Sequence, residues 1–272
     1  MNIWKRYGKS SVALVIACLA LFAAMPMASA QEKSGSVSVV PITDTVGGLT
    51  YSQLSAQWWV RESKLNTPTA LDDCTLMNKP LGTVFFLAGT TGVTLPATKP
   101  RPCPVPSDKA IMFPVFNVEW SQDEAQNQKK LHDPTSSCVI SNDINGHLIT
   151  GTDAAALSAC ATTQAQHATL PGARLAADVD GVMLQDLTKF RAVSTPFEFD
   201  LVEKNPFCPT LTSPLTCPLK NNPAAADGFW IILNPLSPGK HTIHIAATVP
   251  FPEIDFTFKT EVTYILTVQP QK

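Results

Sequence analysis

The chain has 272 residues, of which 15% are charged, with 20 basic and 22 acidic side chains. No basic cluster occurs, and this balance argues against nucleic acid or an anionic membrane surface as a partner. The length suits one β-rich domain or two small ones. Because no charge run or low-complexity linker divides the chain, we predict a single domain over residues 49–272.

Residues 1–30 have the pattern of a secretory signal peptide. Lys5, Arg6 and Lys9 precede an apolar run over 12–24, and small residues at 28–30 form the site that a signal peptidase accepts. The run is shorter than the roughly 20 residues that a membrane span needs. We therefore expect a secreted or periplasmic protein without a membrane span, which begins near Gln31 and carries a net charge of about −5 from 17 basic and 22 acidic residues.

Six of the seven cysteines follow the predicted cleavage site. An even number of cysteines in an exported chain predicts three disulfides, because that compartment is oxidising. Pairing of sequence neighbours is the simplest of the 15 possible arrangements. It gives Cys74 with Cys103, Cys138 with Cys160, and Cys208 with Cys217. No C-x-x-C motif and no cysteine at ligand spacing from a histidine supports zinc instead.

Residues 31–48 are interpreted as a flexible lead-in or an early edge strand. A helix is expected after Thr50, which forms a capping box with Gln53. Its apolar residues recur at helical spacing, and Gln57, Arg61 and Glu62 are expected to face outward. The adjacent Trp58 and Trp59 point about 100° apart on such a helix. One indole is therefore core, and the other is either a stacking platform for a sugar or a packing residue under a loop.

Two strands and two more helices are expected in the middle of the chain. Residues 83–88 are apolar throughout, which is typical of a strand buried on both faces. A long loop over 89–109 leads to a second strand over 110–118, where Pro114 predicts an edge position or a bulge. Capping signals at Ser121 and Asp153 predict short helices that end near residues 130 and 166.

The last third of the chain indicates strands. Asp180-Gly181 predicts a hairpin over 174–184, and residues 196–202 alternate as a half-buried strand does. The stretch DGFWIILNPLSPGKHTIHIAA over 227–247 predicts a hairpin, with arms at 229–233 and 240–246 and a turn between them. A closing strand ends near residue 268. The sum predicts a mainly β chain, an antiparallel β-sandwich or jelly-roll-like domain with about three short inserted helices.

Chemistry-bearing patterns are weak. His241 and His244 form H-x-x-H, but residues three apart on a strand point to opposite faces, so they do not make a metal pair. A site would use one of them with Asp180 or Asp227, and the catalytic candidates are therefore Asp180, Asp227 and His241. The acids Asp72 and Asp73 are either turn formers or part of an acid/base site. No nucleophile elbow, metalloprotease motif or phosphate loop occurs, and we expect no metal and no cofactor.

Several stretches resemble a group of exported bacterial proteins of unknown function. They are Trp58-Trp59, GTVFFLAG over 82–89, CPVP over 103–106, KAIMFPVFN over 109–117, Asp180-Gly181, Phe190-Arg191, DGFW over 227–230, PGKHTIH over 238–244, and Val262-Thr263-Tyr264. The resemblance spans most of the chain after the signal. It implies an exported bacterial domain and carries no activity or functional residue.

Two functional hypotheses follow. The first is a non-catalytic binding or structural protein of the cell envelope or extracellular space, whose ligand is a glycan held by Trp58, Trp59 and Trp230. The second is a hydrolase whose site combines acids with a histidine. Convergence of at least three of Asp72, Asp73, Asp180, Asp227 and His241 in one pocket would favour the hydrolase. A structural protein in which every Trp is core is the remaining alternative.

Overall fold

The computed structural model describes residues 37–67, 70–90, 99–206, 208 and 217–270. It is mainly β, with 39% strand and 23% helix. The predicted signal peptide and the first residues of the predicted lead-in, up to residue 36, lie outside the described residues. Residues 35–272 cluster as one unit.

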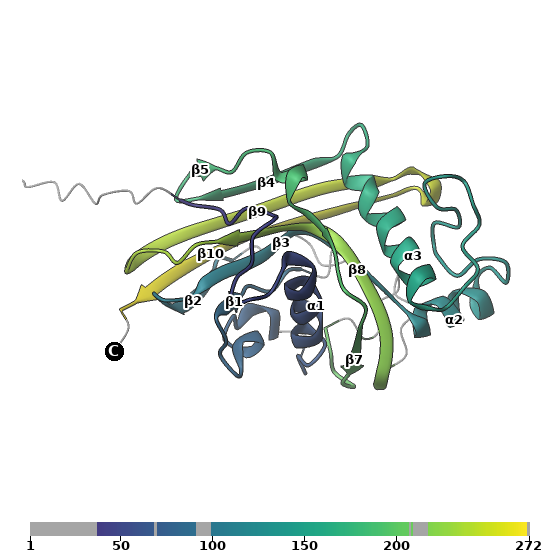
Figure 1. The fold of residues 1–272 in the computed structure, drawn as a ribbon, viewed down its shortest axis with the longest axis horizontal. Coiled ribbons are helices and arrows are strands. Elements are labelled where there is room, and N and C mark those ends of the chain that lie inside the picture. Colours follow the sequence, from purple (N-terminus) through teal and green to yellow (C-terminus); the bar gives the residue numbers. More distant parts are fainter. Residues whose placement is uncertain (1–36, 68–69, 91–98, 207, 209–216, 271–272) are drawn as a thin grey trace, which may run out of the picture. The chain divides into compact units, whose positions relative to one another are not determined.

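The strands form two sheets that pack face to face (Figure 1). The first sheet consists of β1 (Val84–Phe86), β3 (Ala110–Ser121), β8 (Leu219–Leu233), β6 (Arg191–Val193) and β7 (Phe197–Leu201). The second consists of β2 (Arg101–Pro106), β10 (Phe256–Gln269), β9 (Gly239–Phe251), β4 (Arg174–Val179) and β5 (Val182–Met183). The predicted β-sandwich is confirmed. Both sheets are mixed rather than purely antiparallel, because β1 pairs with β3 and β2 pairs with β10 in parallel.

The centre of the first sheet, formed by β1, most of β3 and the second half of β8, is buried on both faces. Alternate residues of β8 separate into two cores: Phe229, Ile231 and Leu233 pack with the second sheet. Trp230 and Ile232 instead pack with helix α1 (Tyr51–Glu62), which covers the opposite face. A strand between two apolar layers needs apolar side chains at every position. This requirement explains the continuous apolar runs of β1 and of residues 229–233 in β8.

The predicted hairpin over 227–247 is wrong in its pairing, although both arms are strands. β8 pairs with β3, β6 and β7, whereas β9 pairs with β10 and β4. Residues 234–238 therefore cross from one sheet to the other. The physical reason lies in burial: the end of β8 is buried on both faces, while β9 alternates between buried and partly exposed residues. The two arms belong to layers with different surroundings, and five residues that include two prolines do not make a tight hairpin turn.

The predicted flexible lead-in is tied to the domain over its described part, residues 37–48. The Val40 amide donates to the Ile232 carbonyl at 2.8 Å, and the Asn234 amide donates to the Ser38 carbonyl at 2.9 Å. An isolated antiparallel bridge joins Val39 to Leu233. The described part of the segment is therefore bound to the end of β8 by an isolated bridge and does not form a strand of its own.

The predicted loop over 89–109 contains an unpredicted strand, β2. Prolines at every second position concealed it, because proline donates no ladder hydrogen bond. β2 lies at the end of its sheet and pairs only with β10, so alternate positions need no donor. For Pro114 in β3, the predicted bulge is confirmed, because the register shifts between Pro114 and Phe116. The alternative of an edge position is wrong, because β3 lies between β1 and β8.

The three predicted helices are present. They are α1, with the Thr50–Gln53 capping box, α2 (Gln122–Leu131), which Ser121 caps, and α3 (Ala154–Gln166), which Asp153 caps. All three predicted disulfides are confirmed, Cys74–Cys103, Cys138–Cys160 and Cys208–Cys217. They fit an oxidising environment. In the described part of the chain, no helix is both long and apolar enough to cross a membrane.

Candidate functional site

Two of the three tryptophans predicted to bind a glycan lie in the core. Trp58 is 1% exposed and donates from Nε1 to the Leu87 carbonyl at 2.8 Å, and Trp230 is fully buried. Their rings meet edge to face with centroids 5.4 Å apart, and Trp59 packs on Trp58 in the same manner at 5.1 Å. Trp59 is half-buried. A buried indole offers no face to a sugar, so Trp58 and Trp230 serve packing between α1 and the first sheet.

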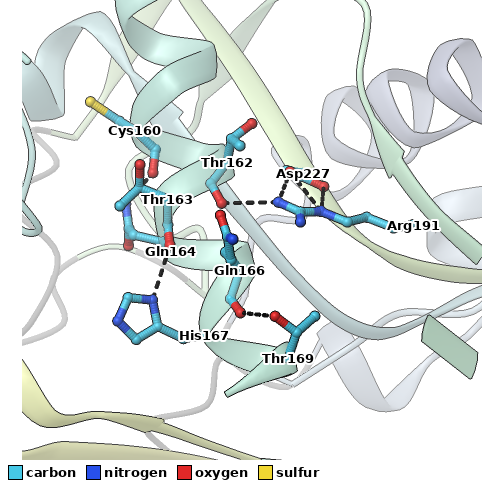
Figure 2. Close-up of polar contacts among 9 residues, drawn as sticks. All are labelled: Cys160, Thr162, Thr163, Gln164, Gln166, His167, Thr169, Arg191 and Asp227. Atoms are coloured by element: carbon cyan, nitrogen blue, oxygen red, sulfur yellow. Dashed lines mark hydrogen bonds and ion pairs between the residues drawn. The ribbon is translucent and has the colours of Figure 1, made fainter. Parts of the chain in front are cut away.

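Asp227 is fully buried and pairs with Arg191. The guanidinium of Arg191 makes contacts of 2.7 and 3.1 Å with both carboxylate oxygens, and it also donates to the Thr162 carbonyl of α3 at 3.0 Å (Figure 2). Arg191 further lies over the Phe229 ring, 5.9 Å from its centroid. The pair therefore joins β6, β8 and α3. Both oxygens of Asp227 bind Arg191 and the residue has no exposed surface, so we assign Asp227 a structural role.

Asp180 and His241 meet at the turn between β4 and β5. His241 Nδ1 lies 2.7 Å from Asp180 Oδ2, and the Thr242 amide donates to Asp180 Oδ1 at 2.7 Å. His241 Nε2 lies 2.9 Å from the Ser237 carbonyl oxygen and 3.5 Å from its hydroxyl.

This order of Ser237, His241 and Asp180 imitates a catalytic triad, but the nearest neighbour of Nε2 is an acceptor. A general base must hydrogen-bond the serine hydroxyl at Nε2, but the Ser237 carbonyl oxygen lies closer to Nε2, at 2.9 Å, than the hydroxyl does, at 3.5 Å. These contacts instead link residues 234–238, which connect the two sheets, to the turn between β4 and β5.

The remaining candidate acids lie elsewhere. Asp72 pairs with Arg101 at 3.1 Å, and Asp73 accepts two hydrogen bonds from Thr75. Of the five residues considered for a hydrolase, only Asp180 and His241 contact each other. His244 lies between Asp178 and Glu261 at 3.2 and 3.1 Å. Across the ranges that the structure describes, no group of three or more His, Cys, Asp or Glu side chains has the geometry of a metal site.

A groove runs along the exposed side of α1 and has a volume of about 550 Å³. This volume lies in the range of small-ligand sites. One wall is a helical stripe, formed by Gln53, Ala56, Gln57, Val60, Arg61 and Lys64. The other wall comes from the segment around η2 (Leu76–Asn78) and from the start of β7, which lies beside α1 (Figure 1). Its lining includes Leu76, Met77, Lys79, Pro80, Thr195 and Phe197.

The α1 groove combines hydrogen-bond donors with apolar surface. The side chain of Gln57 is exposed and makes no hydrogen bond within the described chain. Gln53 uses its side-chain oxygen in the cap of α1 and keeps its Nε2 available. Half-buried Phe197, Val60 and Leu76 supply the apolar part. Such a combination of few polar groups on an apolar lining is typical of ligand sites.

A second hollow, of about 580 Å³, is lined by Asp143, Glu253 and His167 among other residues. His167 is buried there, stacked on Phe251 at 4.7 Å, with Nδ1 facing the Thr163 carbonyl (Figure 2). Its Nε2 lies 2.9 Å from Glu253, and Asp143 lines the same hollow. The two acids make this hollow unsuited to an anion, in contrast to the α1 groove.

Besides that of Asp227, the carboxyl groups of Glu62, Glu119 and Glu124 are buried outside both hollows. Glu119 of β3 and Glu124 of α2 hydrogen-bond each other, and burial raises the pKa of both, that of Glu124 to about 7. Glu62 is fully buried, and burial raises its pKa well above the ordinary value. The expectation that Glu62 faces outward is therefore wrong: α1 turns it inward, toward Arg101, whose charge opposes the rise.

No protein-family model, curated protein or solved structure matches this chain. The argument for function therefore depends on the site itself. Sequence reasoning missed the α1 groove, although it placed Gln57 and Arg61 on the outward face of the helix. The missing information was the opposite wall, which comes from residues far along the chain.

Proposed function

We propose that this chain is an exported, non-catalytic binding protein of the cell envelope or extracellular space, and that it binds a glycan in the α1 groove. The observation that carries the proposal is the combination of Gln57 and Gln53 donors with the Phe197 ring along one groove. Side-chain amides bind sugar hydroxyls, and an aromatic ring packs against the apolar face of a sugar. The predicted signal peptide and the three disulfides support the exported setting.

The hydrolase alternative has less support. Its candidate residues lie apart except for Asp180 and His241, and the imidazole there faces the Ser237 carbonyl. A binding protein needs no such convergence. The groove also depends on α1, whose first turn is fixed by its capping box and whose buried face is anchored by Trp58.

The test is a glycan array probed with the oxidised protein, followed by calorimetric titration of the retained sugars. Gln57→Ala and Phe197→Ala are expected to weaken binding about tenfold each, since each removes one contact of the bound ligand. Gln126→Ala is the matched control, because Gln126 is an exposed glutamine on α2 outside the groove. Retention of no glycan, or equal loss in all three variants, would contradict the proposal. Thermal melts of each variant establish that it is folded.

A further inference from the structure

Every charged side chain that lines the α1 groove is a cation. Arg61, Lys64 and Lys79 lie along it, and its lining contains no carboxylate. The predicted exported chain has a net charge of about −5, so this local excess of positive charge opposes the overall balance. Charges of one sign in a groove attract ligands of the other.

Hydrogen bonds hold the Arg61 guanidinium through Nη1 and leave its other N–H donors available. Its Nη1 donates to the carbonyls of Met77 at 2.7 Å and Pro80 at 3.1 Å, and its guanidinium lies 5.2 Å from the centroid of the Phe86 ring. Within the part of the chain that the structure describes, Nε and Nη2 have no hydrogen-bond partner. A guanidinium fixed before binding loses little side-chain entropy when it takes an anion, and its planar donors match carboxylate and sulfate oxygens.

The three cations also lack a close counter-charge. Among the residues that the structure places, no carboxylate lies within 4.0 Å of the charged nitrogens of Arg61, Lys64 or Lys79. Burial lowers the pKa of Arg61, as expected for a cation partly removed from water without an anion beside it.

The two acids whose pKa these lysines help to lower, Asp200 and Asp73, lie outside the groove lining. The charge of Lys64 helps to lower the pKa of Asp200, but Asp200 forms its ion pair with Lys220, at 2.8 Å. The hydrogen bonds from Thr75 lower the pKa of Asp73 more than the charge of Lys79 does. The positive charge of the groove therefore remains available to a ligand.

We infer that the ligand of the α1 groove is an acidic glycan, one that carries carboxylate or sulfate groups, with Arg61 as the fixed contact and Lys64 and Lys79 at the rim. This inference rests on the proposed function and adds the chemical class of the sugar. The apolar surface of Phe197 and Val60 takes the ring, while the cations take its acidic substituents.

The experiment titrates the oxidised protein with four probes: an oligogalacturonate, a sulfated oligosaccharide, a neutral cello-oligosaccharide and a poly-aspartate peptide. Each is measured at low and high sodium chloride. Lys64→Glu with Lys79→Glu is expected to lower affinity for the acidic sugar at least about tenfold at low salt, and to reduce its salt dependence. Lys130→Glu with Lys259→Glu is the matched control, because both lysines are exposed outside the groove.

Stronger binding of either acidic sugar than of the neutral one, with loss in the groove variant alone, supports the inference, and the preferred probe identifies carboxylate or sulfate. Equal binding of the neutral sugar overturns the inference but leaves the proposed function standing. Binding of poly-aspartate as tightly as of the acidic sugars overturns the assignment to a glycan. Absence of binding to every sugar overturns both proposals.

Discussion

The Asp227–Arg191 contact shows how a single residue can look catalytic in a sequence and be structural in the fold. An aspartate beside a glycine and two aromatic residues suggests a turn or a site. In the structure it sits inside a continuous strand, fully buried, with both oxygens bound by one guanidinium. A buried carboxylate is tolerated only when it is paired in this manner. Its partner lies 36 residues away, where no local pattern points to it.

We predict that Asp227→Asn destabilises the protein by about 3 kcal/mol, because it leaves the partly buried charge of Arg191 without its partner. The measurement is the free energy of unfolding in urea. Lys220→Ala is the control: it breaks the exposed pair with Asp200 and is expected to cost less than about 1 kcal/mol. Equal effects of the two substitutions would contradict a structural role for the buried pair.

At the scale of elements, α1 is fixed at both ends by side chains. Thr50 and Gln53 cap its start, a local pattern that the sequence shows directly. Its end is capped from far away: the buried side-chain amide of Asn205 donates to the carbonyls of Glu62, Ser63 and Leu65 at 2.9–3.1 Å. Carbonyls at a helix end have no partner within the helix, so a remote amide can satisfy them.

We predict that Asn205→Ala destabilises the protein by about 2 kcal/mol, because it leaves buried carbonyls without a donor. The loss should be local. Hydrogen exchange of amides over 60–65 is expected to accelerate, while that of the first turn of α1 stays unchanged. Asn145→Ala, at an exposed loop position, is the control. Uniform acceleration along α1 would contradict a cap confined to its end.

The elements that could be predicted from the sequence are those with local signals. Helix starts, disulfide partners close in sequence and the Asp180-Gly181 turn are local signals, and all were predicted correctly. Sheet assignment is not local: β8 and β9 are adjacent in sequence but hydrogen-bond to strands of different sheets. The α1 groove failed to appear in the sequence for a related reason, since Gln57 and Phe197 meet only after folding. The candidate site therefore required the structure.

At the scale of the whole molecule, the interior contains several buried acids. Glu62, Glu119 and Glu124 are carboxyl groups whose pKa burial raises, and they lie in different parts of the fold. The carboxylates whose pKa is lowered, such as Asp73 and Asp200, are at the surface and titrate below their ordinary values. Between mildly acidic and neutral pH, the raised groups therefore set the sign of the carboxyl contribution to stability.

We predict that stability falls as pH rises from about 5 to 8. A carboxyl with a raised pKa is protonated in the folded state at pH values where the unfolded chain is ionised, so the folded state binds more protons and loses stability as pH rises through that window. For Glu124, a rise from 4.5 to about 7 corresponds to on the order of 3 kcal/mol. Urea midpoints at several pH values measure the slope. Glu119→Gln, which keeps a donor for Glu124 without a proton to lose, is expected to flatten it. A slope unchanged by Glu119→Gln would contradict the assignment of the effect to the buried pair of Glu119 and Glu124.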